Sequence, residues 1–191
     1  VRETQGAYNR AEFARQATGI SFSQAFGRST DRPVIRGQSN VLAGVQFGVE
    51  TGAAYFVDGI YYQGDIQGFD PESIARVEII KGPQSALYGR NTYAGAINYV
   101  TKDPSETLTA SVVGRAAEYR EADILGSVSG PIFGDKLGFR AGARYYTFGG
   151  QFTNQLTGRK VGQEETKSAY LTLVANPTDD LRVRLRGQYQ E

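Results

Sequence analysis

The chain has 191 residues, and its 21 basic and 20 acidic side chains nearly cancel, so the charge does not indicate a nucleic-acid partner. It contains no cysteine and no histidine, which excludes disulfide bonds, thiolate metal sites and histidine acid–base chemistry. A hydrolase would then need a carboxylate pair or a serine–lysine pair, and no spacing marks one. We therefore expect neither a cofactor nor an enzyme.

The composition favours antiparallel β structure. Glycine is abundant at 24 residues, with 12 tyrosines and 10 phenylalanines. No apolar run approaches the roughly 18 residues that a membrane-spanning helix needs, so any membrane contact is expected to use strands. Methionine is absent, including at position 1, which indicates a processed product or a fragment.

The first part of the chain mixes short elements. Residues 9–18 predict a helix that begins with a capping-box spacing and ends at a glycine. Residues 20–26 alternate in the manner of a strand, and residues 33–37 predict a second short strand. Residues 37–52 are rich in Gly, Ser, Asn and Gln and predict a loop.

A hairpin and two further strands follow. Apolar residues 54–57 and 60–62 flank Asp58-Gly59, a strong hairpin signal because both turn residues need positive φ. The next stretch predicts short elements between glycine breakers: a helical turn at 71–75, a strand at 77–80, a turn at 84–88 and a strand at 97–101. Together these elements predict a small α+β unit over residues 1–104, joined to the rest of the chain only through residues 102–107.

After residue 104 long alternating strands take over. Each is about ten residues long with one apolar face, whereas the mean soluble strand has about 5–6 residues and a tilted transmembrane strand about 9–11. Length therefore favours membrane strands. The five predicted strands cover residues 108–116, 122–130, 136–146, 167–176 and 181–190.

Alternate connections between the predicted strands are tight. Residues 131–135 and 176–180 are turn-like, whereas the other two connections are a short link near residues 118–121 and a long polar stretch at residues 148–166. Short turns on one side and longer loops on the other are typical of outer-membrane barrels.

Five motifs in the first half, taken in order, resemble the plug domain of TonB-dependent outer-membrane receptors. They are Ile35-Arg-Gly37, Tyr55-Phe-Val-Asp-Gly-Ile-Tyr61, Ile74-Ala-Arg-Val-Glu-Ile-Ile-Lys-Gly-Pro83, Ala86-Leu-Tyr-Gly-Arg90 and Gly95-Ala-Ile-Asn98. The resemblance implies an α+β plug domain followed by antiparallel transmembrane β-barrel strands. Residues 1–104 would be a plug truncated at its N-terminus, and residues 105–191 the first five or so strands of an incomplete barrel.

The resemblance also implies a function. Such receptors take up a scarce bulky nutrient, such as a siderophore–iron complex, a vitamin or an oligosaccharide, across the bacterial outer membrane. The TonB–ExbB–ExbD complex energises the uptake, and no segment recognisable as its contact precedes the first helix. We expect an outer-membrane location with the plug facing the periplasm, and a monomeric full-length receptor. The alternatives are a β-sandwich adhesion module, which predicts shorter strands and a second apolar layer, and a carbohydrate-active enzyme with paired carboxylates.

In receptors of this family, plug arginines pair with carboxylates on the inner barrel wall. The resemblance therefore makes Arg36, Arg76 and Arg90 candidates for latches between plug and barrel, with Glu78 as a fourth candidate that either pairs with a plug arginine or is solvated.

The last strand places Arg182, Arg184 and Arg186 on its polar face, where they would face the lumen. They would either attract an anionic substrate or pack against the plug. Structural turn roles are expected for Gly37, Asp58, Gly59, Gly82, Pro83 and Gly89. Residues 82–89 lack the lysine–serine ending of a phosphate loop, which argues against nucleotide binding. Residues 38–50 and 148–166 are the expected regions of ligand contact.

Overall fold

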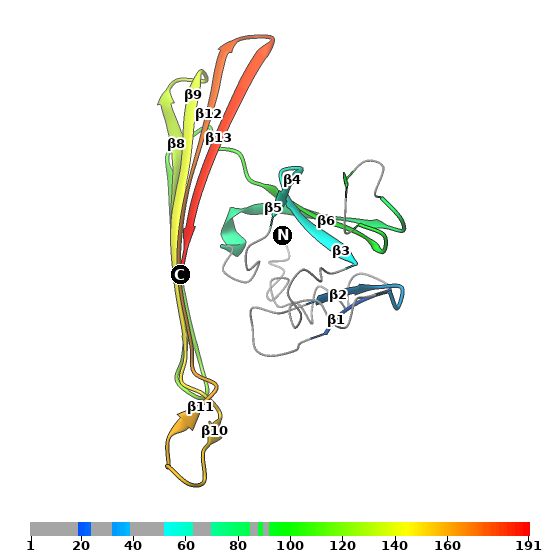
Figure 1. Ribbon diagram of the computed structural model, residues 1–191. Helices are drawn as coiled ribbons and strands as arrows, with labels where there is room; N and C mark the ends of the chain where they lie inside the picture. The colour runs from blue at the N-terminus through cyan, green and yellow to red at the C-terminus, as the bar shows by residue number, and fades with distance from the viewer. Residues whose placement is uncertain (1–18, 24–31, 39–51, 63–69, 85–87, 90–91) are drawn as a thin grey trace. The chain divides into compact units, whose positions relative to one another are not determined.

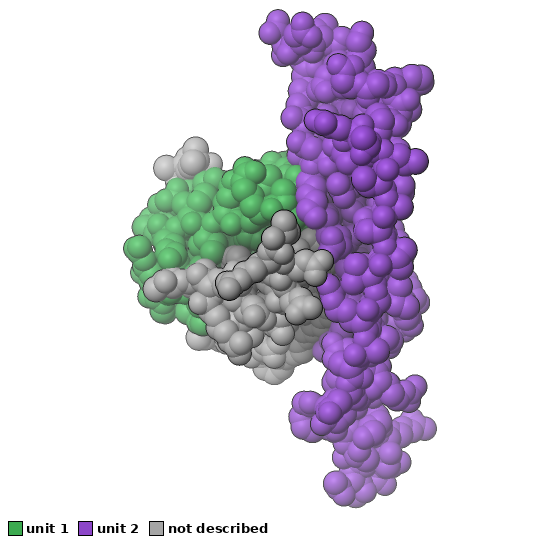
Figure 2. Space-filling view, turned by 180° about the vertical axis from the view of Figure 1, so that it is seen from behind, with its two compact units in different colours: residues 1–67, 74–101 green, residues 68–73, 102–191 purple. Residues whose placement is uncertain are grey.

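The chain divides into two compact units in the computed structural model, residues 1–67 with 74–101, and residues 68–73 with 102–191 (Figures 1 and 2). The structure describes residues 19–23, 32–38, 52–62, 70–84, 88–89 and 92–191. The predicted helix over residues 9–18 lies outside these residues. The grouping differs from the sequence-based division at residue 104, because residues 68–73 group with the second unit.

The first unit contains a four-stranded sheet in the order β4-β3-β6-β5. Its strands are β3 (Ala53–Val57), β4 (Ile60–Tyr62), β5 (Ile74–Lys81) and β6 (Gly95–Thr101). β3 and β6 are parallel, and the other neighbours are antiparallel. β1 (Ile20–Ser23) and β2 (Arg32–Ile35) form a separate antiparallel pair.

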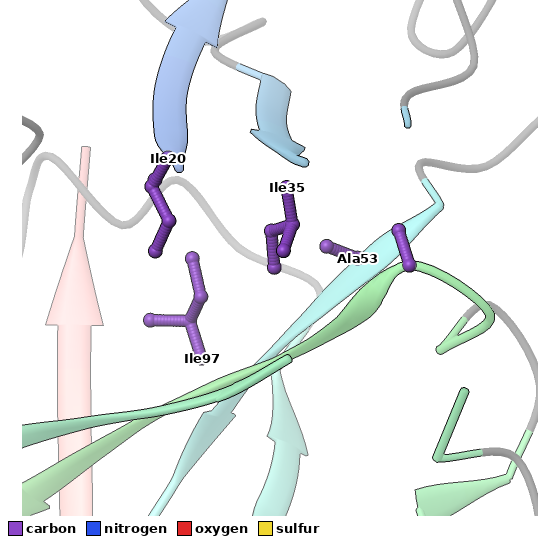
Figure 3. Close-up of a cluster of buried hydrophobic side chains, with 5 residues drawn as sticks. Ile20, Ile35, Ala53 and Ile97 are labelled. Carbon is purple, nitrogen blue, oxygen red and sulfur yellow. The ribbon is translucent and has the colours of Figure 1, made fainter. Parts of the chain in front are cut away.

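The core of this unit lies on both faces of β3 and β6, because alternate residues of a strand point to opposite faces. On one face Ile20 and Ile35 meet Ala53, Ala94 and Ile97 (Figure 3). On the other face Phe56 packs with Ala54, Ala96 and the ring of Tyr88, whose centroid lies 4.8 Å away.

The predicted hairpin at Asp58-Gly59 is confirmed. Asp58 and Gly59 have φ values of 50° and 80°, the combination that a two-residue hairpin turn requires. The Asp58 carboxylate then accepts hydrogen bonds from the main-chain nitrogen and the hydroxyl of Thr101, at 2.8 and 2.7 Å. The hairpin is thereby fixed to the end of β6.

Strand β5 begins earlier than the sequence indicated. Only Pro71–Ser73 form a 3-10 turn, labelled η3, and the strand starts at Ile74, not Val77. The cause is pairing with β6, since Ile74 lies opposite Thr101. Long-range pairing thus overrides the local helical signal of residues 71–75.

The second unit is a five-stranded antiparallel sheet in the order β13-β12-β9-β8-β7. Its strands are β7 (Thr109–Ala117), β8 (Glu121–Phe133), β9 (Leu137–Phe148), β12 (Glu164–Thr178) and β13 (Leu181–Gln190). All five predicted strands are confirmed. β8 and β12 are longer than predicted, at 13 and 15 residues.

Burial in this sheet is inverted relative to a soluble protein. Along β12 the polar face is buried at Thr166, Ser168 and Thr172, whereas Leu171 on the opposite face is 46% exposed. The other strands share the pattern, with exposed large apolar side chains at Val112, Ile124, Val128, Val183 and Leu185. An exposed apolar face over several long strands is typical of the lipid-facing side of a barrel.

The long loop that the sequence placed at residues 148–166 contains a small hairpin. β10 (Phe152–Thr153) and β11 (Lys160–Val161) pair antiparallel within it. Among the described residues, no helix is both long and apolar enough to cross a membrane.

Candidate functional site

The buried polar face of the five-stranded sheet is the candidate site, and its side chains come from every strand. Strand register brings them into rows: Thr172 of β12 lies opposite Arg140 of β9 and Arg186 of β13, and Arg140 lies opposite Ser129 of β8. Hydroxyl and guanidinium groups therefore predominate on this face, and Asp123 supplies negative charge to it.

An ion pair joins β8 and β9 on this face. Arg144 donates two hydrogen bonds to the Asp123 carboxylate, from Nε at 2.8 Å and from Nη2 at 3.0 Å. Both side chains are largely buried, with exposures of 9% and 13%. Arg115 of β7 approaches the same carboxylate to 3.7 Å. Because a two-pronged arginine–carboxylate contact fixes geometry as well as charge, the Asp123–Arg144 pair adds a defined side-chain contact between β8 and β9.

Tyr170 lies flat across the neighbouring strand where Gly142 leaves room. A Cβ built on Gly142 would stand 2.6 Å from the Tyr170 ring, so the missing side chain of the glycine is what admits the ring. The Arg186 guanidinium lies over the same ring at 4.8 Å from its centroid. Ring, glycine and guanidinium form one stack that spans β9, β12 and β13.

The arginines predicted to face the lumen do lie on the polar face of β13. Arg182 binds the Asp103 carboxylate at 2.6 Å, and Arg184 donates to the main-chain oxygen of Lys102 at 3.0 Å. Arg186 donates to the hydroxyls of Thr172 at 3.1 Å and of Ser73 at 3.5 Å. All three contact residues that precede the strands, at Ser73 or at residues 102–103, and Arg186 also contacts Thr172 within β12.

Residues 102–105 lie along the polar face beside those arginines. Arg140 donates to the Asp103 carbonyl at 3.1 Å, and Ser105 donates from its main-chain nitrogen to Ser129 at 2.9 Å. A Cβ on Gly138 would stand 2.8 Å from Pro104, so this glycine admits the proline ring. The segment that leads into β7 is therefore fixed on the sheet.

Asp70 is the most unusual titratable group near this face. It is only 3% exposed, and its Oδ1 accepts a hydrogen bond from the Glu72 nitrogen at 2.8 Å. Its other oxygen is buried, and none of the residues that the structure describes gives it a hydrogen bond. Burial raises the pKa of Asp70, opposed by that backbone hydrogen bond and by the charges of Arg144 and Lys102.

The predicted latch residues of the first unit take different positions. Arg36 has a φ of 52° in the turn after β2 and is exposed. Arg76 binds Glu78 within β5 at 2.8 Å, which is the arginine pairing that the sequence left open for Glu78. The Asn98 amide also donates to Glu78, and this hydrogen bond, followed by that from Arg76, lowers the pKa of Glu78. Arg90 lies outside the described residues. The latch role remains a prediction.

The predicted turn glycines all have positive φ, at 77° for Gly37, 80° for Gly59, 98° for Gly82 and 80° for Gly89. Pro83 is exposed directly after Gly82. Residues 39–50, where ligand contacts were also expected, lie outside the described part.

Sequence reasoning missed Asp70, Tyr170 and the Asp123–Arg144 pair. A signal existed only for Asp70, which precedes Pro71 as an N-cap would. Asp123 and Arg144 both alternate with apolar residues in the sequence, which places each on the polar face of its strand. The strand register that brings the two together is a tertiary property. Among the described residues, no group of three His, Cys, Asp or Glu side chains could hold a metal ion.

Comparison with known proteins adds a family match. Residues 2–96 match the model of the TonB-dependent receptor plug domain. A probable TonB-dependent receptor of Bordetella pertussis, BfrD, is 32% identical over 123 residues, covering 62% of this chain and 15% of that receptor. The vitamin B12 transporter BtuB of Vibrio vulnificus is 38% identical over 119 residues, covering 61% of this chain and 18% of that transporter.

The fold is also similar to that of solved receptors. The ferric yersiniabactin uptake receptor FyuA of Yersinia pestis superposes with a TM-score of 0.81 at 20% identity. The match covers 94% of this chain and 28% of that receptor. It extends the likeness beyond the plug match to the strand sheet. The chain thus spans less than a fifth of each of the two sequence relatives and about a quarter of the solved receptor.

Proposed function

The chain belongs to the family of TonB-dependent receptors, and from that premise we propose that the full-length protein takes up a scarce bulky nutrient across the bacterial outer membrane. Relatives in sequence include a vitamin B12 transporter and a ferric enterobactin receptor, and relatives in fold include a ferric yersiniabactin receptor. We infer a siderophore–iron complex or a vitamin as the substrate, as in these relatives. An oligosaccharide is kept as the third class that the sequence led us to expect.

The single observation that carries the membrane part of this proposal is the inverted burial of β12. A strand that buries Thr166, Ser168 and Thr172 while exposing Leu171 is poorly suited to water. It suits a wall with lipid on one side and a polar interior on the other. Residues 105–191 are accordingly proposed as the first strands of an outer-membrane barrel, and residues 1–104 as its plug, facing the periplasm.

The TonB–ExbB–ExbD complex is the proposed energising partner, because the family is named for its dependence on TonB. Arg36, Arg76, Glu78 and Arg90 remain the proposed latches between plug and barrel. We propose a receptor without enzymatic activity, in keeping with the family.

The β-sandwich alternative predicted shorter strands and a second apolar layer over the sheet. The described strands of 9 to 15 residues and their exposed apolar face contradict both expectations. This alternative is therefore not retained.

Growth on a single nutrient tests the proposal. Cells that lack the full-length gene and cells that regain it would be supplied with a ferric siderophore, cobalamin or an oligosaccharide as the limiting nutrient. We expect the gene to restore growth on one of the three, only while TonB is present. Equal growth on all three without the gene, or restoration that does not depend on TonB, would contradict the proposed function.

A further inference from the structure

Residues 70–73 belong to the second unit, which contains the five-stranded sheet, although the chain up to residue 67 and again from residue 74 belongs to the first unit. Figure 2 colours them with the strands, whereas the residues on either side of this segment, up to 67 and from 74, group with the first unit. We call Asp70–Ser73 the strap. Asp70 is 3% exposed and Ser73 is fully buried, so the strap is no surface loop.

The strap is closed by its own hydrogen bonds. The Glu72 nitrogen donates to Asp70 Oδ1 at 2.8 Å, and the Ser73 nitrogen donates to the Asp70 carbonyl at 3.0 Å. The Ser73 hydroxyl donates to the same carbonyl at 2.7 Å. These contacts form a rigid turn with Asp70 as its N-cap.

The sheet holds this turn through Arg186. Its guanidinium reaches the Ser73 hydroxyl at 3.5 Å and the Thr172 hydroxyl at 3.1 Å, and lies over the Tyr170 ring at 4.8 Å. The planar guanidinium can stack on the ring and donate to both hydroxyls at once, whereas the ammonium group of a lysine cannot. Arg186 is therefore itself positioned by β12 before it reaches Ser73.

A second connection runs through the main chain. The Lys102 nitrogen donates to the Ser73 carbonyl at 2.8 Å, and the Lys102 carbonyl accepts from Arg184 at 3.0 Å. Asp103 next to it binds Arg182 at 2.6 Å. The three arginines of β13 thus reach both the strap and the segment that enters β7.

We propose that the strap belongs to the cooperative unit of the strand sheet and that Arg186 is the positioning residue that keeps it there. The strap then opens with β12 and β13 and not with the four-stranded sheet that flanks it in sequence. Resting on the proposed function, one consequence is that rearrangement of the first unit during uptake leaves residues 70–73 on the strands.

Local exchange tests this assignment. Hydrogen exchange of the full-length receptor in detergent micelles would be followed at rising guanidinium concentration, at the amides of Glu72, Ser73 and Lys102. We expect these amides to lose protection at the same concentration as β12 and β13. Loss of protection together with β3 and β6 would overturn the proposal.

Variants separate a positioning role from general destabilisation. Arg186→Gln is expected to accelerate exchange at the strap amides at least about tenfold while amides within the β9–β12 ladder stay unchanged. We expect Arg186→Lys to resemble Arg186→Gln, because charge alone does not replace the planar guanidinium. Arg115→Gln, an arginine of the same face without a contact to the strap, is the matched control and should leave the strap amides unchanged. Equal acceleration in the strap and in the ladder, or an unaltered strap in Arg186→Gln, would overturn the role of Arg186.

These exchange measurements need neither substrate nor TonB. A strap that opens with the first unit would leave the proposed uptake function intact, and a failed growth test would leave the strap assignment intact.

Discussion

Single residues explain how the polar face is fixed, and Asp70 makes it sensitive to pH. The raised pKa means that the folded strap binds a proton more readily than the unfolded chain does. At low pH Asp70 is protonated, and the neutral side chain is compatible with its buried place in the strap. The stability of the folded strap is lost as the pH rises through the raised pKa of Asp70. The charged and titratable groups around Asp70 are Glu72, Lys102, Arg144 and Tyr170, and burial outweighs them.

We accordingly expect the opening free energy of the strap to fall as the pH rises above the ordinary carboxyl range. Asp70→Asn, which stays neutral, should remove this dependence. Exchange at the Ser73 and Lys102 amides, corrected for intrinsic rates, would measure it between acidic and neutral pH. Parallel pH curves for the variant and the unaltered protein would contradict the assignment.

A second residue-scale prediction concerns the glycine under Tyr170. Gly142→Ala should destabilise the sheet by about 1–3 kcal/mol, because the added methyl group would overlap the Tyr170 ring. Gly126→Ala is the control, since a Cβ there meets nothing within 4 Å. The temperature at which the full-length receptor loses its compact form on a gel would be compared for the two variants. Equal midpoints would show that the ring can move aside.

At the scale of the element, the exposed apolar face of β12 leads to a prediction about the membrane. If that face lies in lipid, Leu171→Lys should lower the free energy of unfolding in lipid vesicles by up to about 2–4 kcal/mol near the bilayer centre. The folded fraction in the vesicles would fall accordingly. Leu156→Lys serves as the control, because Leu156 lies in the turn between β10 and β11 and is 96% exposed. Similar folded fractions for both variants would mean that the face of β12 is not in the bilayer.

Elements were also where sequence reasoning was most accurate. Period-two alternation identified all five long strands because each has one apolar and one polar face. Asp58-Gly59 identified its hairpin because the turn demands positive φ at both positions. The start of β5 was wrong because pairing with β6 decides it, and the pairing of Arg76 with Glu78 stayed open because alternation does not fix side-chain partners.

At the scale of the whole molecule, neither unit is a single continuous stretch of the chain. Since residues 68–73 group with the strands, a chain that ends at residue 101 lacks their partners. We expect such a chain to keep the paired β3, β5 and β6 while the amides of Glu72 and Ser73 exchange freely. Nuclear magnetic resonance of the shortened chain would show this directly. Protected Glu72 and Ser73 amides would indicate that the strap folds without β12 and β13.

The order of the five-stranded sheet has a consequence for how the protein forms. Every strand pairs with the long strand before or after it in the chain, so each addition closes only a short loop. Such a sheet can form by adding one strand after another to the edge strand, in the order of the sequence. The parallel pairing of β3 with β6 must instead wait for the hairpin and β5 that lie between them. We therefore expect the five-stranded sheet to form early and from local contacts. The four-stranded sheet would be completed later and in a single step.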